Sequence, residues 1–189
     1  MTHPTRLDDP HLLAECDLTK NRTRGPGGQH RNKVESGVHL THRPTGIEAG
    51  ATERRSSVEN QRVALRRMRL NLAVEVRAPV SLGDAASDLW RSRVKSPRKQ
   101  PAAPPDPLLP KLRAPATGDR IAISPDHEDF PAILAEALDF IADANWDHKP
   151  AAIRLGVSPS QLLKLIKDHP PAFVHLNRQR ATRGLHALK

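Results

Sequence analysis

The stretch SSVENQRVALRRMRLNLAVEVR (Ser56–Arg77) has the most regular hydrophobic pattern in the chain. Ser56 is followed three residues later by Glu59, which is the spacing of a capping box at a helix start. Apolar residues then recur at intervals of three and four, along one side of a helix: Leu65, Met68, Leu72 and Val76. The stretch therefore predicts a long amphipathic helix that buries one stripe against a partner.

Four arginines of the same stretch fall largely outside the apolar stripe: Arg62, Arg66, Arg67 and Arg69. Exposed arginines of this kind usually form a solvated helix face. Beside a basic loop they can also contact RNA phosphates. The sequence alone leaves both interpretations open.

The residues before this helix have the pattern of a β-hairpin. In VESGVHLTH (34–42), Val38 and Leu40 alternate with His39 and Thr41, so one face is apolar and His39 and His42 are expected at the sheet surface. Residues 43–46 (RPTG) predict a turn, and residues 47–52 (IEAGAT) a returning strand. Residues 12–20 (LLAECDLTK) also read as a strand, with Cys16 as a core residue. A small sheet packed on a long helix is an α+β fold.

Between the first two predicted strands lies RTRGPGGQHRNKVESG (Arg22–Gly37). Glycines at 27 and 28 let the main chain take unusual backbone angles and approach a ligand closely. Gln29 follows them and offers a free backbone N–H. Basic residues on both sides suit a phosphate backbone; they are Arg22, Arg24, Arg31 and Lys33.

Composition points to a polyanionic partner. The chain has 189 residues and a net charge of +9, and residues 1–100 alone carry +8. Aromatic content is 3% with no Tyr, which disfavours base stacking on an aromatic sheet. The single cysteine excludes an intrachain disulfide and a cysteine zinc site. No metal or other cofactor is expected. Because no apolar run approaches the ~20 residues of a membrane span and the N-terminus is acidic, we expect a cytoplasmic protein.

The sequence predicts three segments: an N-terminal domain at 1–91, a Pro-rich basic linker at 92–125 and a helical domain at 126–189. Seven prolines between 97 and 115 argue against a regular helix in the linker. Residues 128–146 predict a helix that is apolar on one side and acidic on the other. Residues 149–170 then read as helix, turn and helix, with Gly156 ending the first and Ser158 capping the second. A third short helix with a basic end is expected to follow.

The string GPGGQHRNKVESGVHLTHRPTGI (Gly25–Ile47), followed by Arg55, Ser56 and Asn60, resembles the catalytic domain of class I peptide chain release factors. The resemblance covers roughly residues 10–77. Three positions depart from the family pattern: Arg31, Gly37 and Ser57. They affect fine positioning and leave the Gly-Gly-Gln triplet intact.

The resemblance implies a ribosome-dependent hydrolase of the ester between nascent peptide and tRNA, with a protruding loop that reaches the peptidyl-transferase centre of the large subunit. The implied catalytic residues are Gly27, Gly28 and Gln29. Expected partners are peptidyl-tRNA and ribosomal RNA, and the protein is expected to be a monomer. The expected RNA-contacting residues are Arg22, Arg24, His30, Arg31, Asn32, Lys33, Arg55 and Arg66.

About 20 residues precede the loop, so we expect no separate codon-reading domain and a resemblance to the short hydrolases that rescue stalled ribosomes. Those hydrolases usually end in a Lys/Arg-rich tail, and here a helical unit stands in its place. Two alternatives remain open for that unit: a helix-turn-helix that reads DNA, or a module that docks on the ribosome. Sequence does not identify the stalled complex or show whether Gln29 is methylated.

Overall fold

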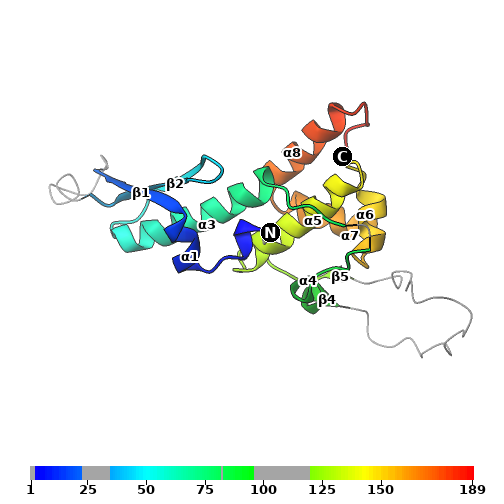
Figure 1. The fold of residues 1–189 in the computed structure, drawn as a ribbon, viewed down its shortest axis with the longest axis horizontal. Coiled ribbons are helices and arrows are strands. Elements are labelled where there is room, and N and C mark those ends of the chain that lie inside the picture. The colour runs from blue at the N-terminus through cyan, green and yellow to red at the C-terminus, as the bar shows by residue number, and fades with distance from the viewer. Residues whose placement is uncertain (1–2, 23–34, 82, 96–119) are drawn as a thin grey trace, which may run out of the picture. The chain divides into compact units, whose positions relative to one another are not determined.

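The structure is a computed structural model that describes residues 3–22, 35–81, 83–95 and 120–189 (Figure 1). It divides into two compact units, Met1–Ala78 and Pro79–Lys189, called here the N-terminal and C-terminal units. Residues 79–95 thus group with the helices that follow them. The expected functional boundaries at residues 91 and 125 remain a prediction.

The N-terminal unit is built on helix α3 (Ser57–Glu75). Ser56 is its N-cap, and its side chain accepts a hydrogen bond from the backbone N–H of Glu59 at 3.5 Å. The predicted stripe is confirmed, because Leu65, Met68 and Leu72 are buried in the core and Val76 packs against it. Figure 1 shows the helix lying along the sheet.

The sheet has three antiparallel strands in the order β1 (Cys16–Asn21), β2 (Gly37–His42) and β3 (Ile47–Ala51). Leu40 pairs with Leu18 on one side and with Ala49 on the other. Strands β2 and β3 pack on α3. The predicted hairpin and its turn are confirmed, and so is the buried position of Cys16.

The prediction of a strand at residues 12–20 is wrong for its first four residues. The chain begins with η1 (Pro4–Arg6) and α1 (Asp9–Ala14), and β1 starts only at Cys16. Asp8 caps α1 by accepting a hydrogen bond from the backbone N–H of His11 at 3.0 Å, and Pro10 lies in the first turn. Both features favour a helix start. Leu12 thereby enters the core, with no exposed surface.

The C-terminal unit contains a short strand pair and five helices among its described residues. Strands β4 (Val94–Lys95) and β5 (Arg120–Ile121) pair antiparallel. The helices are α4 (Asp88–Arg93), α5 (Phe130–Asp143), α6 (His148–Arg154), α7 (Pro159–Lys167) and α8 (Pro170–Ala181). The strand pair joins the two sides of residues 96–119, the central part of the expected linker, which lie outside the described residues.

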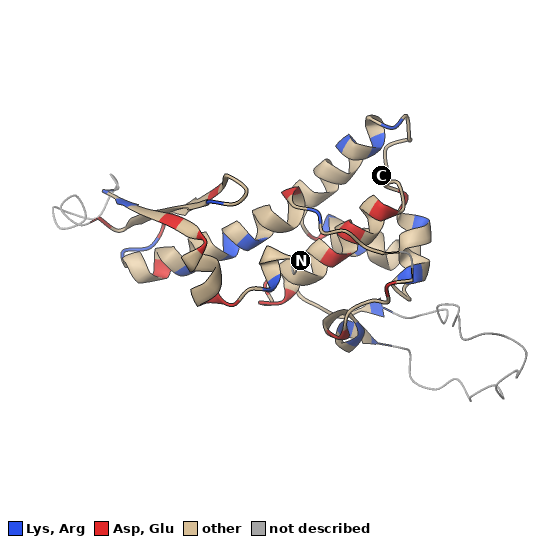
Figure 2. Cartoon of the chain, in the orientation of Figure 1, with Lys and Arg blue, Asp and Glu red and all other residues tan. Residues whose placement is uncertain are grey.

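Most of helix α5 is buried, which corrects the expectation of an acidic outer face. Figure 2 shows the acidic positions along it, yet Glu136 and Asp139 are each only 6% exposed. Glu136 accepts hydrogen bonds from the backbone N–H of Ser87 at 2.7 Å and from its hydroxyl at 2.5 Å. The segment before α4 covers this side of α5, and the sequence pattern of the helix alone could not show that.

Helices α6 and α7 confirm the predicted helix, turn and helix. Gly156 has a φ of +69° in the turn, a conformation that favours glycine. Ser158 caps α7 by accepting from the backbone N–H of Gln161 at 3.3 Å, and Pro159 is the first helical residue. Helix α8 is the predicted third helix. Within the described ranges, no helix is long and apolar enough to span a bilayer.

Candidate active site

The candidate catalytic loop starts where the β1–β2 ladder ends, at the pair Asn21 and Gly37. The predicted catalytic triplet Gly27–Gln29 lies in residues 23–34, outside the described residues. The same holds for five predicted RNA contacts: Arg24, His30, Arg31, Asn32 and Lys33. The structure therefore describes the two ends of this loop and the surroundings of those ends.

At the entry and exit of the loop, Arg22 and Glu35 form an ion pair. The Arg22 Nε lies 3.7 Å from Glu35 Oε1, and both side chains are more than half exposed. An exposed pair of this kind contributes between 0 and about 1 kcal/mol. The ion pair matters for geometry rather than for stability, because it joins the two ends of the loop just beyond the pair Asn21 and Gly37.

The exit of the loop is held from the other side by Asn60, in the first turn of α3. Its carboxamide Nδ2 donates to the carbonyl oxygens of Ser36 at 2.6 Å and Arg54 at 2.9 Å. Its Oδ1 accepts from the backbone N–H of Arg54 at 2.8 Å. Asn60 has no exposed surface, and Ser36 is 2% exposed. Three hydrogen bonds from one buried side chain thus join the loop exit, the segment before α3 and the helix itself.

The sequence identified Asn60 only as a family match and gave it no role. One feature of the sequence could have indicated a role: an asparagine near the start of an amphipathic helix needs hydrogen-bond partners once it is buried. The segment just before the helix, which contains Arg54, was the nearest source of such partners.

The arginines of α3 divide into two kinds. Arg67 is bound within the N-terminal unit, donating to the carbonyl oxygen of Gly50 at 2.7 Å and pairing with Glu53. The hydrogen bond from Arg67 lowers the pKa of the Glu53 carboxyl. Arg69 pairs with Asp9 at 2.6 Å and donates to the carbonyl oxygen of Leu7, and its side chain is 14% exposed. These two guanidinium groups are engaged in holding the fold.

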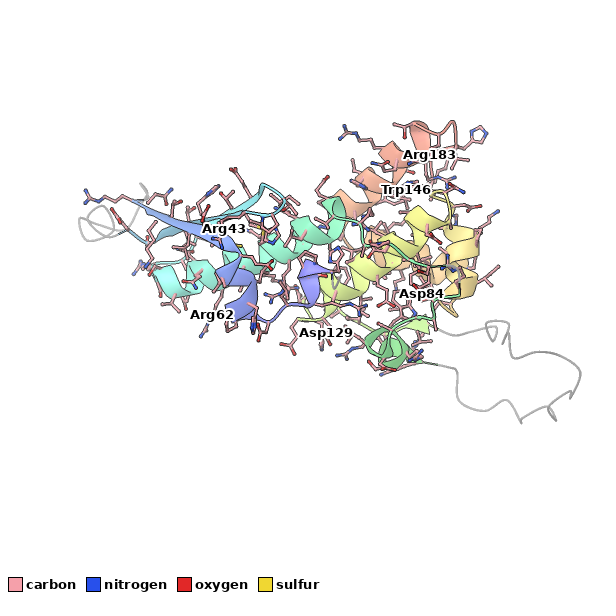
Figure 3. The ribbon with its side chains drawn as sticks, viewed as in Figure 1. Arg43, Arg62, Asp84, Asp129, Trp146 and Arg183 are labelled. Atoms are coloured by element: carbon pink, nitrogen blue, oxygen red, sulfur yellow. The ribbon has the colours of Figure 1, made fainter. Side chains whose placement is uncertain are left out.

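The other candidate contacts differ in their exposure. Arg55 is exposed, as is Arg62, which is labelled in Figure 3, whereas Arg66 is half-buried. The predicted contacts Arg55 and Arg66 thus belong to the segment before α3 and to the helix, while Arg22 is at the loop entry.

His42 is buried with no exposed surface, so its expected place at the sheet surface is wrong. Its Nε2 lies 3.0 Å from the Glu15 carboxylate and its Nδ1 2.7 Å from the Thr45 hydroxyl. Neighbouring Arg43 (Figure 3) donates to Asp17 at 3.0 Å and to the carbonyl oxygen of Ala14. The residues THRPTG therefore fix the β2–β3 turn against the start of β1. His39 is 42% exposed and 3.6 Å from Glu48, as a surface residue should be.

The sequence profile described as the RF-1 domain matches residues 13–99. Among curated proteins, the chain is 45% identical over 74 residues to peptide chain release factor 1 of Acidiphilium cryptum, covering 38% of this chain and 21% of that protein. It is 38% identical over 88 residues to the chloroplastic peptide chain release factor PrfB1 of Arabidopsis thaliana, covering 43% and 19%. Mitochondrial peptide chain release factor 1 of Bos taurus is 33% identical over 76 residues, covering 40% and 17%.

The matched part spans about a fifth of the length of these relatives. It contains the loop, the whole sheet, helix α3 and the first residues of the C-terminal unit. Residues 13–99 of this chain are therefore similar to the RF-1 domain of class I peptide chain release factors.

Proposed function

We propose that this protein acts in translation termination as a ribosome-dependent hydrolase of the peptidyl-tRNA ester. The observation that carries the proposal is the RF-1 domain match at residues 13–99, which includes the string GPGGQH (25–30) between two paired strands. The matched relatives are named as peptide chain release factors.

In the proposed reaction, a water oxygen bonds to the ester carbonyl carbon, and the bond from that carbon to the terminal ribose oxygen of the tRNA breaks. The water gives one proton, by way of the solvent or the ribosome, to the ribose oxygen. Negative charge develops on the carbonyl oxygen, and a fixed backbone N–H placed there stabilises it. We assign that donor to Gln29, with Gly27 and Gly28 permitting the loop conformation.

Positive charges around the loop would hold it against RNA at the peptidyl-transferase centre of the large subunit, because phosphate contacts position a protein on RNA. The proposed contacts at the loop ends and near α3 are Arg22, Arg55 and Arg66. Those within the loop are Arg24, His30, Arg31, Asn32 and Lys33. No cofactor enters the proposed reaction.

We further propose that the reaction proceeds without codon recognition, as in ribosome rescue. This part of the proposal extends the resemblance of the sequence to the short hydrolases that rescue stalled ribosomes. After the RF-1 domain comes a helical unit of a different kind.

The test is single-turnover peptide release from ribosomes stalled on a truncated message, compared with ribosomes that display a stop codon or a sense codon. Gly28→Ala should lower the release rate by about two to three orders of magnitude, the typical cost of losing one such donor, while ribosome binding persists. Asn71→Ala, at an exposed position on α3 outside the loop, is the control. Release only at stop codons would reject the codon-independent part, and no release from any complex would reject the hydrolase.

A second candidate function concerns the C-terminal unit. Helices α6 and α7 with their tight turn have the arrangement of a helix-turn-helix, and Lys149, Lys164 and Lys167 are exposed on them. Such a unit could dock on ribosomal RNA or read duplex DNA. Weaker retention of ribosomes by a variant that lacks the positive charges of Lys149 and Lys164 would favour docking, and retention of duplex DNA by the wild-type chain would favour DNA reading.

A further inference from the structure

The side chain of Asn60 is polar, buried and fully hydrogen-bonded within the N-terminal unit. Neither the apolar core nor the proposed reaction explains why it is there. An asparagine side chain has two N–H donors and one carbonyl acceptor. Here both donations go to carbonyl oxygens, of Ser36 and Arg54, and the acceptor takes the N–H of Arg54. Each function of the amide therefore has its own backbone partner.

This set of partners selects asparagine over residues of the same size. Aspartate could accept from Arg54 N–H, but its ionised carboxylate would face two carbonyl oxygens with no proton to donate. Alanine would remove the hydrogen bond that Asn60 donates to the buried Ser36 carbonyl, and losing a buried hydrogen bond lowers stability. We call these three hydrogen bonds the Asn60 clamp. Another small side chain could fill the same space but could not form all three.

The clamp contacts the chain just after the loop, at Ser36. Three successive residues there have different partners. Glu35 forms an ion pair with Arg22, Ser36 accepts a hydrogen bond from Asn60, and Gly37 pairs with Asn21 in the β1–β2 ladder. Through Arg54, the same carboxamide also fixes the segment that carries Arg54 and Arg55. The loop exit and two exposed cations are therefore parts of one connected arrangement.

We infer that Asn60 is a positioning residue for peptide release: it fixes Ser36, at the exit of the catalytic loop, relative to the Arg54–Arg55 segment. This inference rests on the proposed hydrolase function. It predicts that removing the clamp lowers the rate of release even at saturating protein, where weaker ribosome binding through Arg55 no longer limits the rate.

The first measurement is amide hydrogen exchange on the full chain, which needs no ribosome. In Asn60→Ala, the amide of Arg54 should lose about tenfold or more of its protection, because its acceptor is gone, whereas Leu40 in the β2 ladder should keep most of its protection. Asn71→Ala is the matched control on the same helix, since Asn71 donates to the carbonyl oxygen of Glu48 at 2.8 Å, on β3. Unchanged protection of Arg54 in Asn60→Ala would overturn the clamp.

The second measurement is single-turnover release at saturating protein. Asn60→Asp should release at least about tenfold more slowly than wild type, as expected when a reacting group is misplaced by a fraction of an ångström to an ångström. Asn71→Ala should stay within about twofold of wild type. Met68→Ala removes a core side chain of the same helix and controls for stability, and below its melting temperature it should keep a near-normal saturating rate.

Equal rates for Asn60→Asp and wild type would overturn the inference, and so would equal reductions in Asn60→Asp and Met68→Ala. A wild-type chain that releases no peptide from any complex would reject the hydrolase itself, and the positioning role with it. The two failures are distinguishable because one appears only in the variants and the other already in the wild type.

Discussion

The imidazole of His42 lies 3.0 Å from the carboxylate of Glu15, and this contact joins the end of β2 to the junction of α1 and β1. The His42 side chain is 1% exposed and that of Glu15 is 43% exposed, so a surface carboxylate reaches a buried ring. On its other side the ring meets the Thr45 hydroxyl in the β2–β3 turn. A single histidine therefore connects three segments of the N-terminal unit.

His42→Ala should lower the free energy of unfolding of this unit by about 2–4 kcal/mol, because it leaves a cavity and removes two hydrogen bonds. His39→Ala is the control, on the more exposed face of the same strand, with an expected change within about 0.5 kcal/mol. Both tryptophans lie in the C-terminal unit, so the measurement should be hydrogen exchange of β2 amides under native conditions. Equal protection of the Leu40 amide in both variants would contradict the structural role.

A pH-dependent loss of stability is expected from His3. Burial lowers the pKa of this histidine from 6.5 to about 4. Its Nδ1 lies 2.7 Å from the Thr5 hydroxyl and its Nε2 3.2 Å from the carbonyl oxygen of Val76. Between pH 4 and 6.5 the unfolded chain binds more protons at this site than the folded chain does. The free energy of unfolding is therefore highest above pH 6.5, the pKa of His3 in the unfolded chain. It declines as the pH falls from there to about 4, the pKa in the folded chain, by at most about 3 kcal/mol.

His3→Gln should reduce this decline in the N-terminal unit, whereas His186→Gln, at an exposed position, should leave it unchanged. Burial also lowers the pKa of His148 and of His169 in the C-terminal unit. The comparison must therefore use β2 amides, at about pH 7 and about pH 5, on either side of the unperturbed histidine pKa. An identical acid effect in His3→Gln and wild type would assign it to other groups.

A third prediction concerns Trp90 on α4, whose indole N–H donates to the carbonyl oxygen of Leu155 at 2.9 Å. Leu155 stands directly before the Gly156 turn, so α4 supports the helix-turn-helix. Trp90→Phe should destabilise the C-terminal unit by about 1–3 kcal/mol, because the buried carbonyl is left without its donor and the smaller ring leaves space. Urea unfolding followed by Trp146 fluorescence would measure it. Ser92→Ala on the same helix should change stability by less than about 0.5 kcal/mol, and a similar midpoint for both variants would contradict the prediction.

Periodicity predicted those elements whose stripe or alternation is complete within the element, such as α3, the β2–β3 hairpin and the α6–α7 pair. It failed where burial depends on a distant segment. Helix α5 has an acidic side in sequence, yet residues near Ser87 cover that side and satisfy Glu136. His42 was expected at the surface, although the alternation of β2 places it on the buried face with Val38 and Leu40, where Glu15 and Thr45 contact it. The catalytic triplet was inferred from resemblance alone, while the clamp at Asn60 became visible only when its three backbone partners were placed.

The turn between α5 and α6 has a feature that sequence could not predict. Asn145 and Trp146 both have positive φ, 53° and 63°, a conformation that asparagine adopts more readily than most residues and that is rare for a tryptophan. Arg180, 8% exposed, donates to the carbonyl oxygen of Trp146 at 2.7 Å. Arg183 lies over the indole ring, 5.4 Å from its centroid (Figure 3). Helix α8 therefore holds the α5–α6 turn in place.

The last prediction separates ribosome docking from catalysis. Lys149 on α6 and Lys164 on α7 are exposed. If these lysines bind RNA phosphates, the double variant Lys149→Glu/Lys164→Glu should bind ribosomes at least about tenfold more weakly. The slope of log binding constant against log salt concentration should also become less steep, by about 0.7–0.9 for each phosphate that is no longer neutralised. Release at saturating protein should remain, because the loop is unchanged. The double variant Lys95→Glu/Arg120→Glu, on β4 and β5, makes the same change in charge and is the control. Normal binding with an unchanged slope would exclude docking through α6 and α7, and sequence-selective retention of duplex DNA by the wild-type chain would identify the unit as a DNA reader.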